Sequence, residues 1–215
     1  MLILTLLFFA GLWAGAQNAL AGGGSFVTLP ALILSGLDAR TANIVSTVAL
    51  FPGQVLSGVA GAPMVSGTKS LSFRVLFALS IVGGALGGIL LLYTPSQFFA
   101  GLVPWLVLFA TCMFALGSFG PKPAKPKADL GLVGTGIAQF LIAIYGGYFG
   151  GGIGFLMLAA LTAAGLPVRN AGATKNALAG VMNASAVLIL WHLIGLGCWP
   201  LVLEPFLAGN LAFGC

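Results

Sequence analysis

Charged residues are so rare in this chain that they restrict the environment in which it can fold. Of its 215 residues, 5% are charged and 60% are hydrophobic, whereas a soluble domain carries about 25% charge. Residues 1–21 contain no charged residue at all. Because a water-facing surface cannot be assembled from this composition, we predict an all-α integral membrane protein. The net charge of +5 is too small and too scattered for nucleic-acid binding.

Seven apolar stretches have about the 20 residues that a helix needs to cross the hydrocarbon layer. They are residues 2–21, 43–61, 74–93, 98–118, 130–149, 171–194 and 199–215. The stretches 25–36 and 153–165 are too short to cross comfortably, so we predict half-helices or re-entrant segments there. Asn18-Ala19-Leu20-Ala21 resembles a signal-peptide cleavage site. Since no positive region precedes it, we expect a retained first helix.

A polar linker separates the fourth and fifth predicted spans. Residues 120–129 alternate proline with three lysines, which is typical of an extended segment on the cytoplasmic side of a membrane. Lys69 and Arg74 fall on the same side if residues 25–36 do not cross. That agreement favours a cytoplasmic N-terminus.

The two halves of the chain match when one is shifted by 129 positions. Gly22 and Gly23 then meet Gly151 and Gly152, and Arg40 meets Arg169. We therefore predict two homologous repeats, residues 1–118 and 130–215, joined by the linker 119–129. Such repeats are typical of transporters, with the binding site at their interface. The halves are parallel if residues 25–36 do not cross and inverted if they do; the sequence leaves both open. A full second repeat would extend roughly 30 residues beyond Cys215, so we expect a truncated or naturally short member.

Each half carries a glycine hinge, Gly22-Gly23-Gly24-Ser25-Phe26 and Gly150-Gly151-Gly152-Ile153-Gly154-Phe155. Consecutive glycines break a helix because each costs about 1 kcal/mol relative to alanine. A helix that restarts after such a break directs its first amides and its dipole at the gap, where they favour an anion. Close helix packing is the alternative role of glycine, and it is the role that we expect for Gly83, Gly84, Gly87 and Gly88.

Polar residues follow each hinge at helical spacing. Asn43 and Thr47 are four residues apart and share a helix face, as do Asn170 and Thr174. Hydroxyls and amides beside a cation can bind a small oxyanion. A lysine at the start of an apolar membrane helix costs free energy, so we expect Lys175 to have a function. For Arg40 and Arg169 an interfacial role is an equal alternative. The predicted anion-binding residues are Gly22, Gly23, Gly24, Ser25, Arg40, Asn43, Thr47, Gly150, Gly151, Gly152, Arg169, Asn170, Thr174, Lys175 and Asn176.

No metal, cofactor or enzymatic site is predicted. His192 is the only histidine, and the three cysteines, Cys112, Cys198 and Cys215, lack metal-ligand spacing. We expect small buried cysteines, with a reactive thiol as the alternative, and an interfacial pair of His192 with the preceding tryptophan. Glu204 is either a proton-coupling carboxylate or a loop residue.

The chain resembles the TauE/SafE family of sulfite exporter-like permeases. The resemblance rests on both glycine hinges, on the run Thr47-Val48-Ala49-Leu50-Phe51-Pro52-Gly53, on Gly165-Leu166-Pro167 and on Lys175-Asn176. It implies a multi-pass protein of the bacterial inner membrane that moves small sulfur-containing anions such as sulfite or sulfonates outward, with proton coupling commonly supposed. Two departures are Gly61-Ala62-Pro63 in place of a basic residue and the missing final spans.

The predicted partners are a small anionic substrate and the lipid bilayer, with a homo-oligomer left open. A transporter of another small anion and a non-transporting membrane subunit are alternative functions. A membrane enzyme would need an acid/base pair or a metal cluster, which three acidic residues, one histidine and three cysteines do not supply convincingly.

Overall fold

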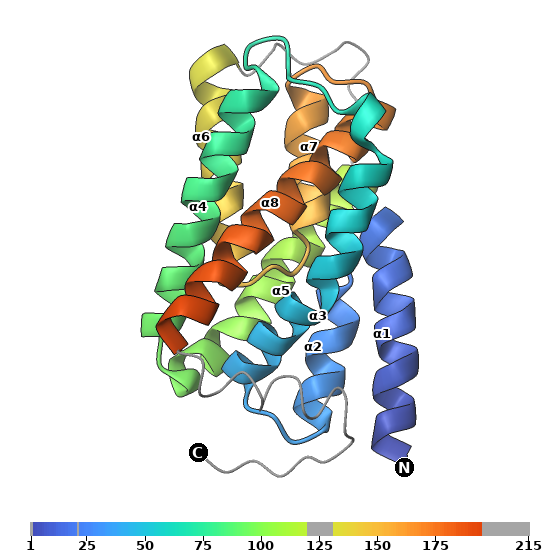
Figure 1. Ribbon diagram of the computed structural model, residues 1–215, viewed down its shortest axis with the longest axis vertical. Coiled ribbons are helices and arrows are strands. Elements are labelled where there is room, and N and C mark those ends of the chain that lie inside the picture. The colour runs from blue at the N-terminus through green and yellow to red at the C-terminus, as the bar shows by residue number, and fades with distance from the viewer. Residues whose placement is uncertain (1, 21, 120–130, 195–215) are drawn as a thin grey trace.

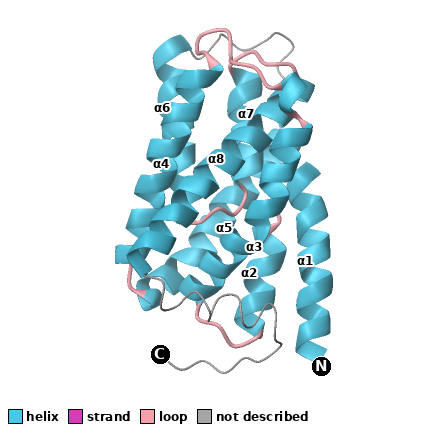
Figure 2. Ribbon diagram, viewed as in Figure 1, coloured by secondary structure: helices cyan, strands magenta, loops and turns pink. Residues whose placement is uncertain are grey.

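The computed structural model of the chain describes residues 2–20, 22–119 and 131–194, which form eight α-helices and one short 3-10 helix. This part of the chain contains no strand (Figure 2). Five of its helices are long and apolar enough to cross a membrane, in agreement with the predicted all-α membrane fold. The predicted seventh span, 199–215, lies outside the described residues, as do Cys198, Glu204 and Cys215.

The first three helices form a hairpin followed by one long helix. α1 (Leu2–Leu20) runs inward from the N-terminal end of the bundle, and α2 (Ser25–Leu34) returns to that end (Figure 1). The 10 residues of α2 are about 15 Å long, half of a hydrocarbon layer of about 30 Å. α3 (Ala39–Ala60) then traverses the bundle. The predicted short helix after the first hinge is therefore present.

Two further helices complete the first half. η1 (Ala62–Met64) leads to α4 (Phe73–Tyr93), and α5 (Ser96–Phe119) follows. α4 packs along α6 and α8 through its glycine face, where Gly83 meets Ala143 and Gly84 meets the backbone of Met182. The expected packing role of these glycines is confirmed. Cys112 on α5 is exposed rather than buried, because it points to the outside of the bundle, where lipid replaces protein.

The last three helices follow the order and bounds of the first three. α6 (Gly131–Tyr148), α7 (Ile153–Ala163) and α8 (Val168–Ile194) begin 129, 128 and 129 positions after α1, α2 and α3. The turn after the short helix uses a left-handed glycine in both halves, with φ of +104° at Gly36 and +89° at Gly165. Figure 1 shows α6, α7 and α8 running opposite to α1, α2 and α3. The second hairpin thus enters the bundle from the other end.

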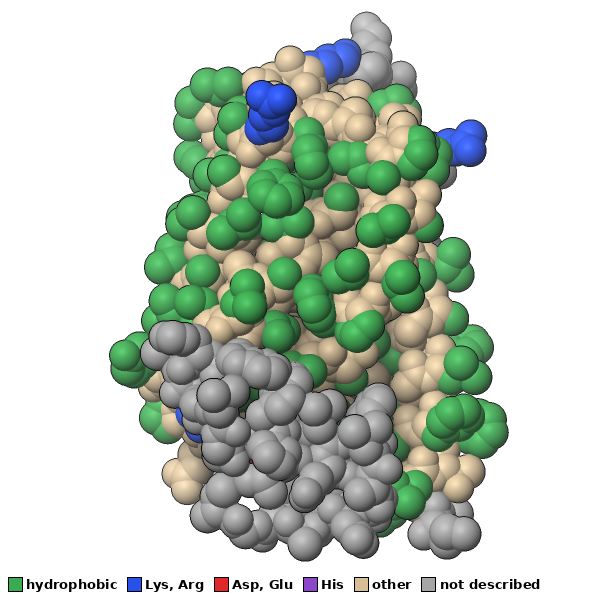
Figure 3. All heavy atoms as spheres, viewed as in Figure 1, with side chains coloured by type: hydrophobic (Ala, Val, Ile, Leu, Met, Phe, Trp, Pro, Cys, Tyr) green, Lys and Arg blue, Asp and Glu red, His purple; other side chains and the backbone are tan. Residues whose placement is uncertain are grey.

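Basic residues gather at the end of the bundle away from the N-terminus. Side-chain carbons of Lys69 lie 3.2 Å from a Cβ built on Gly165, which brings the loop before α4 to the loop before α8. Figure 3 shows most of the visible Lys and Arg side chains at this end and hydrophobic side chains over the middle of the face. The prediction that the N-terminus shares a side with Lys69 and Arg74 is wrong, because α2 carries the chain back to the end where α1 began.

The helices α3 and α8 cross at the centre of the bundle. There the buried amide of Asn183 donates a hydrogen bond to Oε1 of Gln54. We call α1–α3 and α6–α8 the two trios. Gln54 and Asn183 are 129 positions apart, so α3 and α8 meet at corresponding points of the two trios.

Candidate functional site

The two glycine hinges meet inside the bundle. Gly22 has φ of +84°, and a Cβ built on it would overlap Cα of Gly154 in the first turn of α7. Gly152 caps the start of α7 in the left-handed conformation, with φ of 76° and ψ of 4°. A side chain is strained at positive φ, and no space exists for one at Gly22. Glycine therefore allows the two breaks to approach each other backbone to backbone.

Each hinge is also covered by the phenylalanine of the other. A Cβ built on Gly23 would lie 3.2 Å from the ring of Phe155, and one built on Gly152 would lie 3.0 Å from the ring of Phe26. Gly23 and Gly152 are 129 positions apart, as are Phe26 and Phe155. The contacts are therefore reciprocal, and they close the hinges with two aromatic rings.

Lys175 brings a cation to the place where the hinges meet. Its side chain is 2% exposed, and its Nζ lies 3.4 Å from the Cβ position of Gly22. The only acidic side chain among the described residues, Asp38, lies at the start of α3, where it accepts hydrogen bonds from the N–H groups of Arg40 and Thr41. Within the described part of the chain no ion pair or hydrogen bond occupies the ammonium. A buried charge without a partner is costly, and this one faces the glycine break.

Backbone amides line the same junction. Within the described residues, no hydrogen-bond acceptor is found for the backbone N–H groups of residues 23–25 or 151–154. These amides belong to the residues just before α2 and α7 and to the first residues of each helix, where the helix dipole is positive. The junction therefore combines one ammonium with two sets of unpaired donors.

Two asparagines hold the hinges from the opposite trio. Nδ2 of Asn43 on α3 donates to the carbonyl of Tyr148 at 3.1 Å, and Nδ2 of Asn176 on α8 donates to the carbonyl of Ala19 at 3.3 Å. Ala19 and Tyr148 are corresponding positions at the ends of α1 and α6. One N–H of each amide is thus used to cap a broken helix, while Oδ1 of Asn43 is buried without a partner.

Two hydroxyls lie beside the second hinge. Oγ1 of Thr47 is 3.7 Å and Oγ of Ser25 is 4.0 Å from the Cβ position of Gly150. Oγ1 of Thr47 donates to the carbonyl of Asn43 at 2.9 Å. The structure therefore brings together both hinges, Ser25, Asn43, Thr47, Lys175 and Asn176 from the residues that the sequence singled out.

The remaining predicted residues lie toward the ends of the bundle. Arg40 donates from Nη1 to the carbonyls of Leu92 and Thr94 at the end of α4. Arg169 is exposed, and Asn170 donates to the carbonyl of Met64 at 3.0 Å.

Thr174 faces the loop before α4 rather than the hinges. Its Oγ1 donates to the carbonyl of Ser66 and accepts from the N–H of the same residue, both at 3.1 Å. Arg169, Asn170 and Thr174 thus share the end of the bundle that carries this loop, and none of them lies within 4 Å of the Cβ positions of the hinge glycines.

A family model now adds sequence evidence over almost the whole chain. The model described as sulfite exporter TauE/SafE matches residues 7–215. The chain belongs to the TauE/SafE family. This family membership agrees with the resemblance drawn from the motifs.

Three curated relatives of this TauE/SafE protein are named as transporters. A probable membrane transporter protein of Haemophilus influenzae is 30% identical over 201 residues, 91% of this chain and 75% of the relative. The probable membrane transporter protein YfcA of Escherichia coli is 30% identical and covers 87% and 70%. ORF9 of a Sinorhizobium species, named likewise, is 31% identical and covers 91% and 78%. No solved structure matches the chain. The protein is therefore a multi-pass member of a membrane transporter family.

The sequence analysis did not predict two kinds of contact at the candidate site of this TauE/SafE protein. Tyr145 donates to the carbonyl of Gly151 at 2.8 Å, and the reciprocal covering of the hinges by Phe26 and Phe155 was not anticipated. The 129-residue offset was the available signal, because it pairs these two phenylalanines and the two glycines that they cover.

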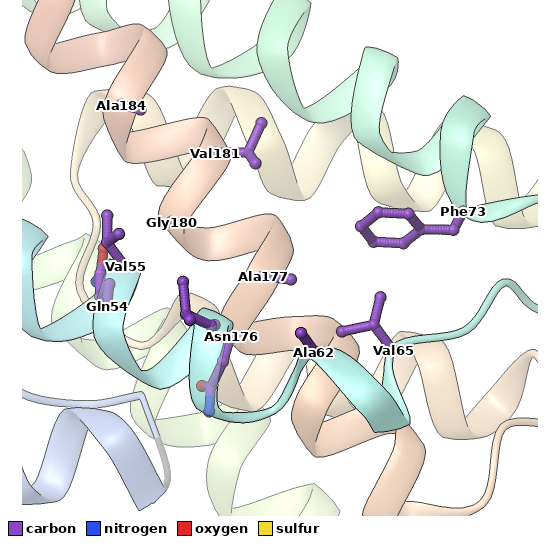
Figure 4. A pocket seen from close by; sticks show the side chains of 12 residues that line it. Gln54, Val55, Ala62, Val65, Phe73, Asn176, Ala177, Gly180, Val181 and Ala184 are labelled. Carbon is purple, nitrogen blue, oxygen red and sulfur yellow. The ribbon is translucent and has the colours of Figure 1, made fainter.

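An apolar cavity between α3 and α8 is a separate feature. It measures about 460 Å³, and its walls are mostly apolar, including Val55, Val59, Ala177 and Val181 (Figure 4). Two polar side chains also line it, but Gln54 is bonded to Asn183, and the amide of Asn176 points away from Val181 and donates to the carbonyl of Ala19. A mostly apolar cavity compensates an anion poorly for lost hydration, so we place the candidate site at the hinges instead.

Proposed function

We propose that the chain is a secondary transporter of small oxyanions, with sulfite or an organic sulfonate as the substrate class, and that the anion binds beside Lys175, next to the junction of the two glycine hinges. The observation that carries the proposal is the buried ammonium of Lys175 beside Gly22, which has no ion pair or hydrogen bond within the described residues. One cation and several backbone donors stabilise a small anion without a cluster of fixed charges, so the anion can also leave.

The two trios are proposed to be inverted repeats that arose by duplication. Support comes from the matching helix bounds, from the reciprocal contacts of Phe26 and Phe155, and from the hydrogen bond between Gln54 and Asn183 at corresponding positions. Inverted repeats can exchange their conformations, which opens a central site to one side of the membrane and then to the other. The hinges are the natural points of movement because each joins a span-length helix, α1 or α6, to a half-helix, α2 or α7, through glycine.

The proposed location is the bacterial inner membrane, with the end that carries Lys69, Arg74 and Arg169 in the cytoplasm, following the positive-inside rule. Transport is proposed to run outward, in line with the family description as an exporter. The N-terminus, at the opposite end of the bundle in Figure 1, is then outside the cytoplasm.

The test is flux in proteoliposomes that contain the purified chain. Uptake of sulfite, sulfate, thiosulfate and an organic sulfonate is compared with and without a pH gradient. We expect Lys175→Gln to abolish saturable flux, whereas the control Lys69→Gln, an exposed lysine at the end of the bundle, retains it. Equal flux in the wild type and in Lys175→Gln would refute the proposed site.

A further inference from the structure

Four hydroxyls and one amide are buried on α2 and α3 near the second hinge. Oγ1 of Thr28 on α2 and Oγ of Ser46 on α3 lie 2.5 Å apart and share a hydrogen bond. Every member of the group is 9% exposed or less. We call this group the α2–α3 oxygen cluster; its members are Ser25, Thr28, Asn43, Ser46 and Thr47.

Asn43 contributes an acceptor that lacks a partner. Its Nδ2 donates to the carbonyl of Tyr148, the last residue of α6, and this bond fixes the orientation of the amide. Its Oδ1 is buried and has no hydrogen-bond partner within the described residues. A buried acceptor left in this state is costly. Because an amide oxygen accepts and does not donate, the group that satisfies it is a donor or a cation and not an anion.

The two trios differ in charge at this point. Ser46 lies 129 positions before Lys175, and the two side chains are 1% and 2% exposed. The position that carries an ammonium on α8 therefore carries a hydroxyl on α3, beside the hydroxyl of Thr28. A cation bound in the oxygen cluster would place a positive charge at corresponding positions of both trios.

We infer that the α2–α3 oxygen cluster binds a small monovalent metal cation, Na⁺, beside the end of α6. Hard cations take oxygen ligands, and the C-terminal end of a broken membrane helix offers carbonyls and the negative end of its dipole. A divalent cation would require carboxylates. Asp38, the acidic side chain of the described residues, is exposed at the start of α3 and is not a member of the cluster. The neutral ligands therefore favour a single positive charge.

The cation also has a role in transport, and this part of the inference rests on the function proposed above. Lys175 and the amide ends of α2 and α7 make the junction of the hinges positive. An anion bound there lowers the electrostatic cost of a nearby Na⁺, and Na⁺ in turn favours the anion. Because such coupling is reciprocal, sulfite should strengthen the binding of Na⁺ by the same factor as Na⁺ strengthens the binding of sulfite.

The test is the melting temperature of the full chain, purified in detergent, in NaCl and in choline chloride of equal concentration. A cation that binds only the folded protein raises the melting temperature in a saturable way. Ser46→Ala removes one ligand, and Thr28→Val is the second variant in case the first does not fold. The matched control is Ser80→Ala, which also removes a buried hydroxyl, but one bonded to Leu76 and Gln139 on α4 and α6.

We expect Na⁺ to raise the melting temperature of the wild type and of Ser80→Ala. In Ser46→Ala or Thr28→Val the apparent affinity for Na⁺ should fall by about 10- to 100-fold, the contribution of one contact to a charged group. Equal melting temperatures of the wild type in NaCl and choline chloride would overturn the inference, because an ordered water would satisfy Asn43 in both salts. An unchanged affinity for Na⁺ in both cluster variants would also overturn it.

Flux in proteoliposomes with NaCl or choline chloride separates this inference from the proposed function. Saturable flux of sulfite without any effect of Na⁺ on the melting temperature refutes only the cation site. A Na⁺-dependent melting temperature without flux supports the cation site and counts against only the transport function.

Discussion

The contact between the two hinges can be tested by adding one methyl group to Gly22. Alanine at its φ of +84° costs about 1–2 kcal/mol, the penalty of a left-handed conformation. The new Cβ would also overlap Cα of Gly154, and overpacking of this kind costs about 1–3 kcal/mol. The expected loss of unfolding free energy for Gly22→Ala is therefore about 2–5 kcal/mol.

Gly36→Ala is the matched control. Gly36 has φ of +104°, and no atom of the described residues lies within 4 Å of its Cβ position, so alanine there carries the backbone strain of about 1–2 kcal/mol without the overlap. The difference between the two variants isolates the contact between the hinges. Both unfolding free energies are measured by denaturant titration in detergent micelles, followed by far-ultraviolet circular dichroism.

The two variants should also differ in transport activity. Gly22→Ala moves the hinges apart and displaces Lys175 Nζ, which lies 3.4 Å from the position of the new Cβ, so flux in proteoliposomes should fall well below that of Gly36→Ala. Equal losses of unfolding free energy in the two variants would refute the reasoning, because the hinges would then not touch in the folded protein.

Three other predictions follow from the same contacts. Lys175→Met should stabilise the folded protein by up to about 3 kcal/mol, the cost of a charge within a membrane helix, while flux is lost; unfolding and flux measured together check these opposite signs. Asn183→Leu combined with Gln54→Leu should show a coupling energy of about 0.5–2 kcal/mol in a double-mutant cycle, and additive losses would contradict the central hydrogen bond. Asp38 is partly buried, which alone raises its pKa, but hydrogen bonds from Thr41, Ser96 and Arg40 outweigh this and lower the pKa below 3.8. The stability that its carboxylate adds is therefore complete above that pH and is lost as the pH falls through the lowered pKa, a dependence that should vanish in Asp38→Asn.

The sequence by itself determined the membrane fold and the position of most helices. Apolar runs of span length leave a chain with 5% charge no other environment, and glycine breaks stop a helix wherever they occur, because propensity is local. The starts of α1, α4, α6 and α8 therefore lie within a few residues of the predicted spans. The offset of 129 could also be read directly from the positions of glycine and arginine.

Only the tertiary structure decided which residues share a site. Arg40 and Lys175 were both predicted to bind the anion, yet Arg40 donates to carbonyls at the end of α4 while Lys175 lies buried at the hinges. The relative direction of the two sets of three helices, α1–α3 and α6–α8, was likewise open, because a half-helix such as α2 can return or continue without any change in its composition. Which of these occurs depends on contacts between residues more than a hundred positions apart, such as Phe26 with Gly152, and no local pattern encodes such contacts.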